Sequence, residues 1–399
     1  MTTKRYLPAL LVVTLIGTIM ELDMSVPSFP DIARDFGASA SAVQLTITCN
    51  FFGYCLGALV HGPLSDRFGR RTVMLAGNTL MLAGALGCTI APHMEFLLAS
   101  RLVQGIGAST SVVLVFVIIG DVYQGTRLFQ MLGLTNAAMS AFMTAAPALG
   151  GIVNRTLGWR GNYATVFGIT LVSLLLMAFF LPETGGAPVK AGVRQVAAGF
   201  RKLLTSKAFL AASLVPSLLF AAYMVFIAAS SFLYTSTFGL STVGFAGHLL
   251  IIVASFSVTS LLASKLIGVL GGPERTVVCG IALTVVGTAL FLAFGRGPWA
   301  TTGPLALFCA GFATVYPVIF GRSMGLHPEL QGAAASLNMS GRALLVTLFT
   351  GVAGSLFTGT SRATAGVMAV AVAVAALLAF VRPSPARDRT AAEPVTETG

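Results

Sequence analysis

Charged residues are scarce in this chain, at 9% of 399 residues, whereas hydrophobic residues make up 56%. The mean hydropathy of +0.88 excludes a soluble domain, because a soluble fold of this length cannot bury that much apolar surface. The sequence also lacks the phosphate-binding pattern G-x-x-x-x-G-K-[ST], and none of its four histidines has metal-ligand spacing. We therefore expect a membrane protein that is not an enzyme, has no metal or cofactor and does not use ATP.

Cysteine is also sparse. The five cysteines are an odd number, show no C-x-x-C spacing and all fall in apolar runs. This pattern favours small packing residues over disulfides or a redox site.

Twelve apolar runs are long enough to cross a bilayer, for which about 20 residues suffice. We expect spanning helices at 7–28, 43–62, 73–91, 95–119, 129–153, 161–181, 208–234, 243–264, 274–294, 299–321, 331–357 and 363–381. The sequence thus predicts an all-α membrane protein with two six-helix halves.

One long polar interruption, 182–207, separates the halves. We expect an N-terminal six-helix bundle at 1–181, a cytoplasmic linker at 182–207, a C-terminal six-helix bundle at 208–381 and a disordered cytoplasmic tail at 382–399. Basic and apolar residues recur with helical spacing over 190–207, which predicts an amphipathic helix on the membrane surface.

The net charge of +11 would suit a nucleic-acid partner, but its distribution argues against one. With twelve spans, 17 of the 24 lysines and arginines fall on one side of the membrane and 5 on the other. This is the positive-inside asymmetry, so both termini are expected in the cytoplasm. The first apolar run has no small-residue cleavage site, which favours a first spanning helix over a signal peptide.

Between the second and third runs, residues 62–71 read G-P-L-S-D-R-F-G-R-R. A loop that only fixed topology would need the arginines, but no aspartate and no glycines. The pattern resembles the signature loop between helices 2 and 3 of the major facilitator superfamily of transporters. The flanking residues, from Gln44 to Gly77, look most like its Bcr/CflA drug-resistance proton antiporters.

This resemblance implies a conformational switch at the cytoplasmic gate, in which Asp66 faces the start of the eleventh span near Gln331. The switch residues are Gly62, Asp66, Arg67, Gly69, Arg70 and Arg71, with Asp121 as a further acidic partner. The matching place in the second half, 265–275, keeps its glycines but has no Asp-Arg pair, so the switch is expected mainly in the first half.

Two further motifs extend the resemblance. The stretch from Arg101 to Ala108 is similar to the family's helix-4 motif, whose arginine lies in the membrane. Pro147, Gly150 and Gly151 resemble the antiporter motif near the outer end of the fifth span, although alanine precedes the proline where that motif usually has glycine.

Ionisable residues inside a bilayer are costly and indicate function; the expected spans hold Glu21, Asp23, Arg101 and Arg342. At about 1.5 Å per residue, Asp23 lies about 24 Å above the cytoplasmic edge and Arg101 about 9 Å below the outer edge of a core about 30 Å thick. They share a level, so we expect Asp23 opposite Arg101. Burial favours the protonated form of such a carboxyl and a nearby arginine favours the ionised form, which is a basis for proton coupling.

Glu21 lies about 200° round the helix from Asp23 and is the second candidate for the proton carrier. The alternative for Asp23 is a hydrated residue at the membrane surface, because Pro27 and Pro30 soon follow it.

Polar and aromatic residues in the spans could line a substrate pocket. Arg342 and Asn338, four residues apart on one helix face, could bind an anionic group; the alternative is that such residues only bond between helices. The candidate pocket residues are Asn50, Tyr54, Asn136, Ser140, Tyr223, Tyr316, Asn338 and Arg342.

The function favoured here is proton-coupled export (antiport) of small amphipathic compounds or drugs by alternating access. The resemblance implies a monomer in a bacterial cytoplasmic (inner) membrane, whose partners are a small-molecule substrate, protons and the lipid bilayer. One alternative is a dedicated exporter of a native metabolite such as an amino acid or a carboxylate siderophore, which the two buried arginines favour. A second is a non-transporting receptor or scaffold with the same fold.

Overall fold

The computed structural model describes residues 3–185, 193–327 and 330–380, and every regular element in them is a helix. The first half holds α1 (Thr3–Asp23), a 3-10 turn η1 (Val26–Ser28), α2 (Phe29–Phe36), α3 (Ala40–Phe68), α4 (Arg70–Ile90), α5 (Met94–Val122) and α6 (Gly125–Phe180). The short helix α7 (Val193–Thr205) precedes the second half, which holds α8 (Lys207–Ser231), a π-helical turn η2 (Phe232–Thr237), α9 (Thr242–Leu261), α10 (Ala263–Val269), α11 (Pro273–Phe294), α12 (Pro298–Gly325), α13 (Gln331–Ser355) and α14 (Ser361–Ala379).

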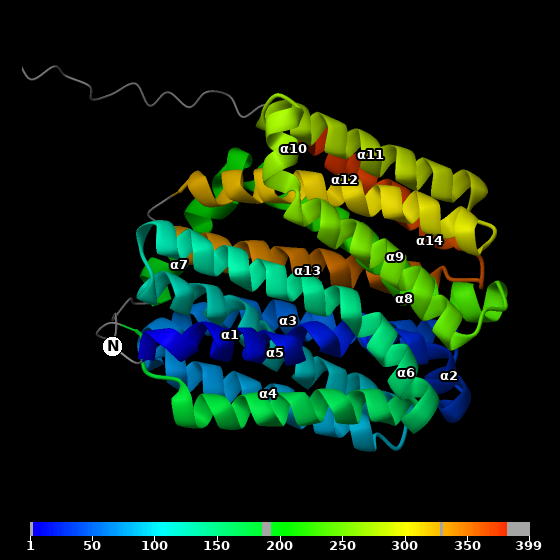
Figure 1. Cartoon of the computed structure of the whole chain (residues 1–399), viewed down its shortest axis with the longest axis horizontal. Coiled ribbons are helices and arrows are strands. Elements are labelled where there is room, and N and C mark those ends of the chain that lie inside the picture. Colours follow the sequence, from blue (N-terminus) through cyan, green and yellow to red (C-terminus); the bar gives the residue numbers. More distant parts are fainter. Residues whose placement is uncertain (1–2, 186–192, 328–329, 381–399) are drawn as a thin grey trace, which may run out of the picture.

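The long helices lie side by side in two halves, one above the other in Figure 1. Ten helical stretches of the described chain are long and apolar enough to cross a membrane. One of them, α6, is two arms, because Gly158 breaks the helix with φ 72°. With these two arms and the more polar α13, twelve spanning helices are present, and the predicted fold class is confirmed.

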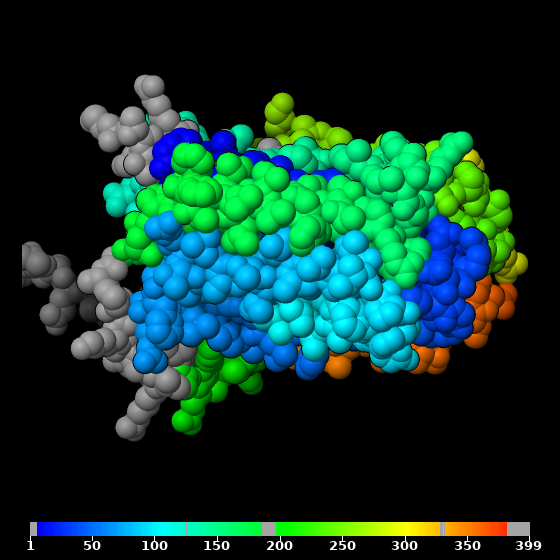
Figure 2. Space-filling view, turned by 90° about the horizontal axis from the view of Figure 1, so that it is seen from below, coloured from blue at the N-terminus to red at the C-terminus, as the bar shows by residue number. Residues whose placement is uncertain are grey.

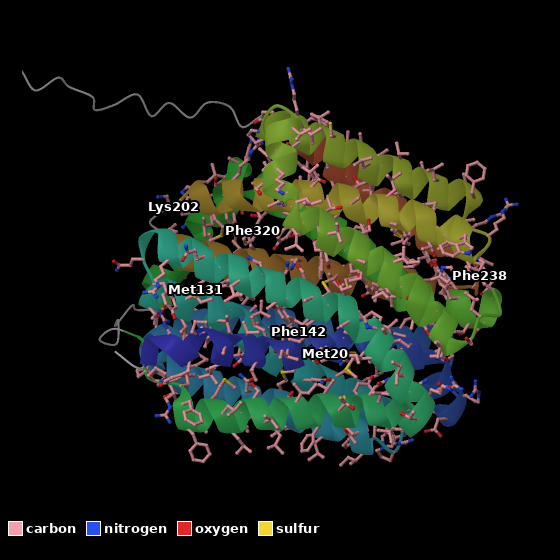
Figure 3. All side chains as sticks on the ribbon, in the orientation of Figure 1. Met20, Met131, Phe142, Lys202, Phe238 and Phe320 are labelled. Carbon is pink, nitrogen blue, oxygen red and sulfur yellow. The ribbon has the colours of Figure 1, made fainter. Side chains whose placement is uncertain are left out.

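Helices suit this environment because lipid offers no hydrogen bonds, so each backbone group must find its partner within the chain. The outer flanks of the bundle are correspondingly apolar. Leu86, Val172 and Phe179 are exposed, and the side chains along the lower flank, where α4 and the second arm of α6 lie, are largely carbon (Figure 3).

The clearest differences from the sequence-based expectation lie at two places in the first half. The first span ends at Asp23, and a helix that was not predicted, α2, follows it after η1. The stretch 62–71 is not a ten-residue loop, because α3 continues through Asp66 to Phe68 and only Gly69, with φ 91°, breaks the helix. Polar residues at a helix end can remain helical in water, so their polarity did not mark the boundary.

The two halves meet along a seam where α3 packs against α13 and α6 against α9. At the end of the bundle that carries α2, here called the α2 end, this seam is closed. Ser41 Oγ donates to the Gly354 carbonyl at 2.6 Å, and the rings of Phe29 and Phe232 lie 6.5 Å apart. In the space-filling view, α2 covers this end beside green and orange segments of the second half (Figure 2).

The opposite end, here called the α7 end, carries the start of α1 and the linker helix. Leu203 of α7 is fully buried against Phe209 and Ala334, so α7 packs on the starts of α8 and α13. The start of the predicted amphipathic helix, 190–192, and the predicted tail, 382–399, lie outside the described residues.

Candidate functional site

A buried ion pair joins α1 to α5. Arg101 Nη1 donates to Glu21 Oε2 at 3.4 Å, and the side chains are 0% and 3% exposed. Asn50 of α3 donates to both carboxylate oxygens of Glu21, at 3.3 and 3.4 Å. Gly105 allows this arrangement, because a Cβ there would lie 1.9 Å from the Asn50 carbonyl oxygen. The pair is therefore held in place by close packing of α3 on α5.

The Arg101 guanidinium has further contacts. It donates to Gln104 Oε1 at 2.7 Å and lies 5.8 Å from the centre of the Tyr163 ring. Its Nε and Nη2 atoms are buried without a hydrogen-bond partner in the described residues. The positive charge is balanced by Glu21, yet the guanidinium keeps unused donors.

Asp23 does not occupy the place expected for it. The carboxylate that meets Arg101 belongs to Glu21, because two residues rotate the helix by about 200° and only one of the two acids can point at α5. Asp23 is the last residue of α1 and is 3% exposed. Its Oδ1 atom has no hydrogen-bond partner among the described residues.

Tyr223 of α8 stands near Asp23 across the seam. Its hydroxyl is buried and likewise has no partner in the described chain, and the charge of Asp23 acts on it. Two buried polar atoms without a partner in the described chain, one from each half, therefore lie on the two sides of the seam near each other.

The glycines of the antiporter-like motif pack next to Asp23. A Cβ on Gly150 would lie 2.3 Å from the carbonyl oxygen of Met24, and one on Gly151 would lie 3.0 Å from the Ala246 side chain of α9. Gly150 thus lets α6 touch the residue after Asp23, and Gly151 lets it touch the other half.

Arg342 of α13 sits in an aromatic part of the seam. Its guanidinium lies 4.8 Å from the centre of the Phe220 ring, and Nη1 donates to the Tyr316 hydroxyl at 3.4 Å. The charge of Arg342 also acts on the hydroxyl of Tyr54 in α3. Phe51, one turn before Tyr54, contacts Phe220 with ring centres 6.0 Å apart.

A small pocket opens beside Arg342. Its lining comes from α8, α12 and α13: Pro216, Ser217, Tyr316, Phe320, Asn338, Met339 and Arg342. Asn338 is buried and donates to Ser323 Oγ at 3.1 Å. Figure 3 labels Phe320, whose ring stacks on Tyr316 with centres 5.4 Å apart.

The other predicted pocket residues lie elsewhere. Asn136 is exposed on the first arm of α6. The backbone carbonyl of Ser140 accepts from Ser257 Oγ at 3.2 Å, and Thr144 bonds Ser257 at 2.8 Å, so this face of α6 joins the two halves.

Sequence reasoning missed Phe51 and Phe220. A signal was present: Phe51 with Tyr54, and Phe220 with Tyr223, are aromatic pairs three residues apart, a spacing that places both members on one helix face.

The predicted switch residues form one cluster at the α7 end. Arg70 bonds Asp66 and also Asp121, the latter at 3.1 Å. Glu183, after α6, accepts from the backbone amides of Arg70 and Arg71 at 2.8 and 3.2 Å, which satisfies the free amides at the start of α4. Asp66 thus pairs within the first half, and the side chain of Gln331, its expected neighbour, lies outside the described residues.

Gly62 is the switch residue that touches the second half. A Cβ there would lie 2.8 Å from Ser336 Oγ of α13. Arg71 donates to the Ala178 carbonyl at 2.6 Å, and Arg67 lies over the Phe68 ring at 5.1 Å; both contacts are within the first half.

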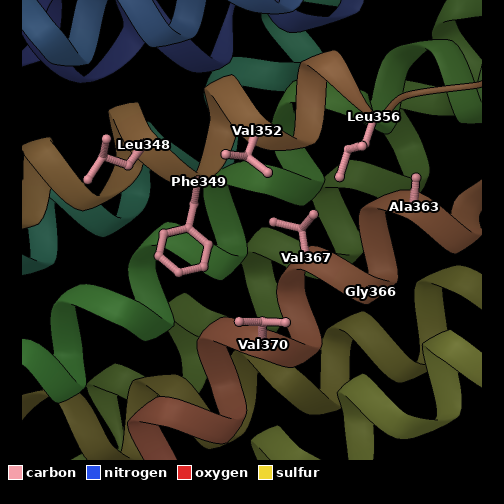
Figure 4. A pocket seen from close by; sticks show the side chains of 8 residues that line it. All are labelled: Leu348, Phe349, Val352, Leu356, Ala363, Gly366, Val367 and Val370. Carbon is pink, nitrogen blue, oxygen red and sulfur yellow. The ribbon is translucent and has the colours of Figure 1, made fainter.

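A second hollow in the described residues is a different kind of surface. It lies between α13 and α14 and is lined only by apolar residues, among them Leu348, Val352 and Val370 (Figure 4). These three side chains are exposed on the flank of the bundle, so the hollow belongs to the surface that faces lipid.

Comparison with known proteins agrees with this arrangement. The family model of the Major Facilitator Superfamily matches residues 11–350. The chain is 26% identical to a bicyclomycin resistance protein homolog of Haemophilus influenzae, over 79% of this chain and 80% of that protein. It is 25% identical to the multidrug resistance protein MdtL of Klebsiella pneumoniae, over 79% and 80%. The xylose transporter XylE from E. coli, in a partially occluded inward-open conformation, superposes with a TM-score of 0.73 at 15% identity, over 94% and 98% of the two chains.

Proposed function

Since the chain belongs to the major facilitator superfamily, and is thus a multi-pass membrane transporter and not an enzyme, we propose that it is a proton-coupled exporter of small amphipathic compounds. Drugs are the first class of cargo to test, because the relatives include proteins named for bicyclomycin and multidrug resistance. In this proposal the protein works as a monomer in a bacterial cytoplasmic membrane, and the α7 end with both termini faces the cytoplasm.

The observation that carries proton coupling is the contrast between two buried carboxylates. Glu21 is balanced by Arg101, whereas Asp23 is buried, with one carboxylate oxygen that has no partner among the described residues, and its charge acts on the Tyr223 hydroxyl, which also has no partner there. A buried charge without a partner is costly, so a group in that position tends to exchange its charge for a proton. Asp23 is therefore the proton carrier, and Glu21 is the second candidate.

The place of these groups supports alternating access. Asp23 belongs to α1 and Tyr223 to α8, and η1 after Asp23 contacts α8 and α9. When the halves part at the α2 end, η1 must leave these helices, and Asp23 gains access to water on that side. Protonation removes the charge that opposes closure, and release on the other side restores it.

The switch cluster lies at the α7 end, where the gate on the cytoplasmic side is proposed. The network of Arg70 with Asp66 and Asp121 ties the ends of α3, α4 and α5 into one rigid unit. That unit abuts α13 at Gly62 and Ser336. A rearrangement that gives Asp66 the start of α13 as its partner would add an anion at a helix N-terminus, which stabilises by about 0.3–1 kcal/mol, and would favour closure of the cytoplasmic side.

The test is transport in proteoliposomes with bicyclomycin as probe. An imposed pH gradient should drive its accumulation, and collapse of the gradient with a protonophore should stop it. Accumulation that ignores the gradient would contradict proton coupling.

A second candidate is export of one native metabolite with a negative charge. Arg342 favours it, because this arginine forms no salt bridge within the described residues. A thermal-shift screen of metabolites on purified protein separates the two, since bound ligand stabilises according to its affinity and concentration. One compound far above the rest supports the dedicated exporter, and many weak ligands support the drug exporter.

A further inference from the structure

Arg342 is a positively charged residue in the second half of the bundle, and this half contains very few acidic residues. From Lys207 to Ala379 the sequence contains two acidic residues, Glu274 and Glu329. Glu274 is 82% exposed at the start of α11 and pairs with Arg322 at 2.7 Å. No salt bridge to Arg342 occurs among the described residues, so its charge is balanced by no carboxylate there.

The contacts that Arg342 does make are weak acceptors. They are the Tyr316 hydroxyl at 3.4 Å, the Met339 thioether at 2.9 Å, the Tyr54 hydroxyl and the face of Phe220. A guanidinium has five N–H donors in a planar fork that matches a carboxylate. Since the Arg342 side chain is half-buried and lines the pocket, the remaining donors are available to a ligand. An anion would bind there by charge-assisted hydrogen bonds. These are stronger than any of the hydrogen bonds that Arg342 makes in this structure.

The pocket adds a second donor and apolar walls. The Tyr316 hydroxyl accepts from Arg342 and so keeps its own proton to donate. Phe220 and Phe51, from opposite halves, meet edge to face beside Arg342, so an aromatic ligand that reaches Arg342 would pack against aromatic rings. The pocket is too small for a head group in this state, so a bound anion would have to widen it, and the rest of a ligand would extend along these rings.

The helices around the pocket can also adjust. Pro216 in α8 and Pro317 in α12 lie inside their helices, where each proline removes one backbone hydrogen bond and favours a kink. Pro216 lines the pocket and Pro317 follows Tyr316 in the chain. Small changes of these kinks would fit the pocket to head groups of different size.

We propose that Arg342 and Tyr316 form an anion subsite, and that the transporter takes aromatic compounds with a carboxylate or similar anionic group. This inference rests on the proposed function, because it names the cargo of the same seam. It makes Arg342 a substrate-binding residue, with Tyr316 as a second donor and Phe220 as the stacking surface.

The test is binding to purified protein without any gradient, so it is independent of proton coupling. The probes are matched pairs with the same ring: benzoate with benzamide, and 2-naphthoate with 2-naphthamide. Wild type should bind each carboxylate more tightly than its amide. Arg342→Gln should weaken carboxylate binding by about tenfold to a hundredfold, the range of a lost charged hydrogen bond, and leave amide binding unchanged. Arg362→Gln, at an exposed arginine on α14, is the matched control and should behave as wild type.

Two further variants keep the proposal testable if Arg342→Gln fails to fold. Arg342→Lys retains the positive charge but loses the planar set of N–H donors that matches a carboxylate. Carboxylate affinity should therefore fall by a smaller factor than in Arg342→Gln. Tyr316→Phe removes one donor and should lower carboxylate affinity several-fold with no effect on amides. Equal wild-type affinity for carboxylates and amides, no binding of either, or unchanged carboxylate binding in the Arg342 variants would overturn the anion subsite. Failure of gradient-driven bicyclomycin transport, by contrast, would overturn proton coupling and leave this binding result intact.

Discussion

Glu21 Oε2 lies 3.4 Å from Arg101 Nη1, in a place where the two side chains are 3% and 0% exposed. A buried pair of this kind is weak evidence for stability as a pair, but loss of one partner leaves an uncompensated charge and costs about 3–5 kcal/mol. Glu21 therefore holds Arg101, and with it the contact between α1 and α5, in this state.

The first prediction follows from that pair. Glu21→Gln keeps the shape of the side chain and removes its charge, so the melting temperature in detergent should fall clearly. The double variant Glu21→Gln with Arg101→Gln removes both charges and should recover part of the loss. A single variant that melts like wild type would show that the pair is not needed to hold α1 on α5.

The second prediction concerns Gly150. A Cβ there would lie 2.3 Å from the Met24 carbonyl oxygen, so Gly150→Ala must displace the segment that follows Asp23. Overpacking of this kind typically costs about 1–3 kcal/mol, and we expect both lower melting temperature and slower transport. Gly168→Ala, in the second arm of α6 with nothing within 4 Å of the added Cβ, is the matched control. It should be neutral or slightly stabilising, as alanine in a helix usually is. The same effect from both substitutions would refute the steric argument.

The third prediction concerns Asp66. Asp66→Asn removes one acidic partner of Arg70 but keeps the positive charges that fix topology, so membrane insertion should be normal. If the cluster helps to close the α7 end, transport should slow. Distances between spin labels at the α7 ends of α3 and α13 should shift toward longer values. Normal transport with an unchanged distance distribution would leave the cluster with a topological role only.

The fourth prediction concerns orientation. A cysteine in place of Arg201, exposed on α7, should be inaccessible to an impermeant thiol reagent added outside the cell. One in place of Arg296, exposed at the other end between α11 and α12, should react. Cys279 is the exposed native cysteine of the described chain and is first replaced by serine. The reverse pattern would invert the proposed topology.

Sequence alone predicted the helix count and the two halves. Each span must form its backbone hydrogen bonds within its own helix in lipid, so it is visible in the sequence as a long apolar run. The resemblance to the signature loop also predicted that Asp121 is an acidic partner of the arginines around Asp66, and Arg70 pairs with it. Sequence alone could not predict that Glu21 and not Asp23 meets Arg101. Depth along a helix follows from residue counting, but the direction of a side chain depends on how α1 is rotated against α5, which packing at Gly105 and Asn50 decides.

The seam was the least predictable part. The electrostatic coupling of Asp23 with Tyr223 and the contact of Phe51 with Phe220 join residues about 170–200 positions apart in the sequence. No local pattern encodes either of them. The helix α2 was missed for a similar reason: it is too short for a spanning pattern, and its residues are held by contacts to α6, such as Asn154 with Asp31 at 2.6 Å.

The central claim is that Asp23 carries the proton, and one pair of assays on Asp23→Asn tests it most directly. In proteoliposomes, exchange of labelled for unlabelled bicyclomycin needs substrate binding and alternating access but no net proton movement, whereas accumulation driven by a pH gradient needs the proton carrier. We predict that Asp23→Asn retains exchange and loses gradient-driven accumulation, while Glu95→Gln, at a carboxylate that is 83% exposed, retains both. Gradient-driven accumulation by Asp23→Asn at the wild-type rate and with the wild-type pH dependence would contradict the account and transfer the role to Glu21.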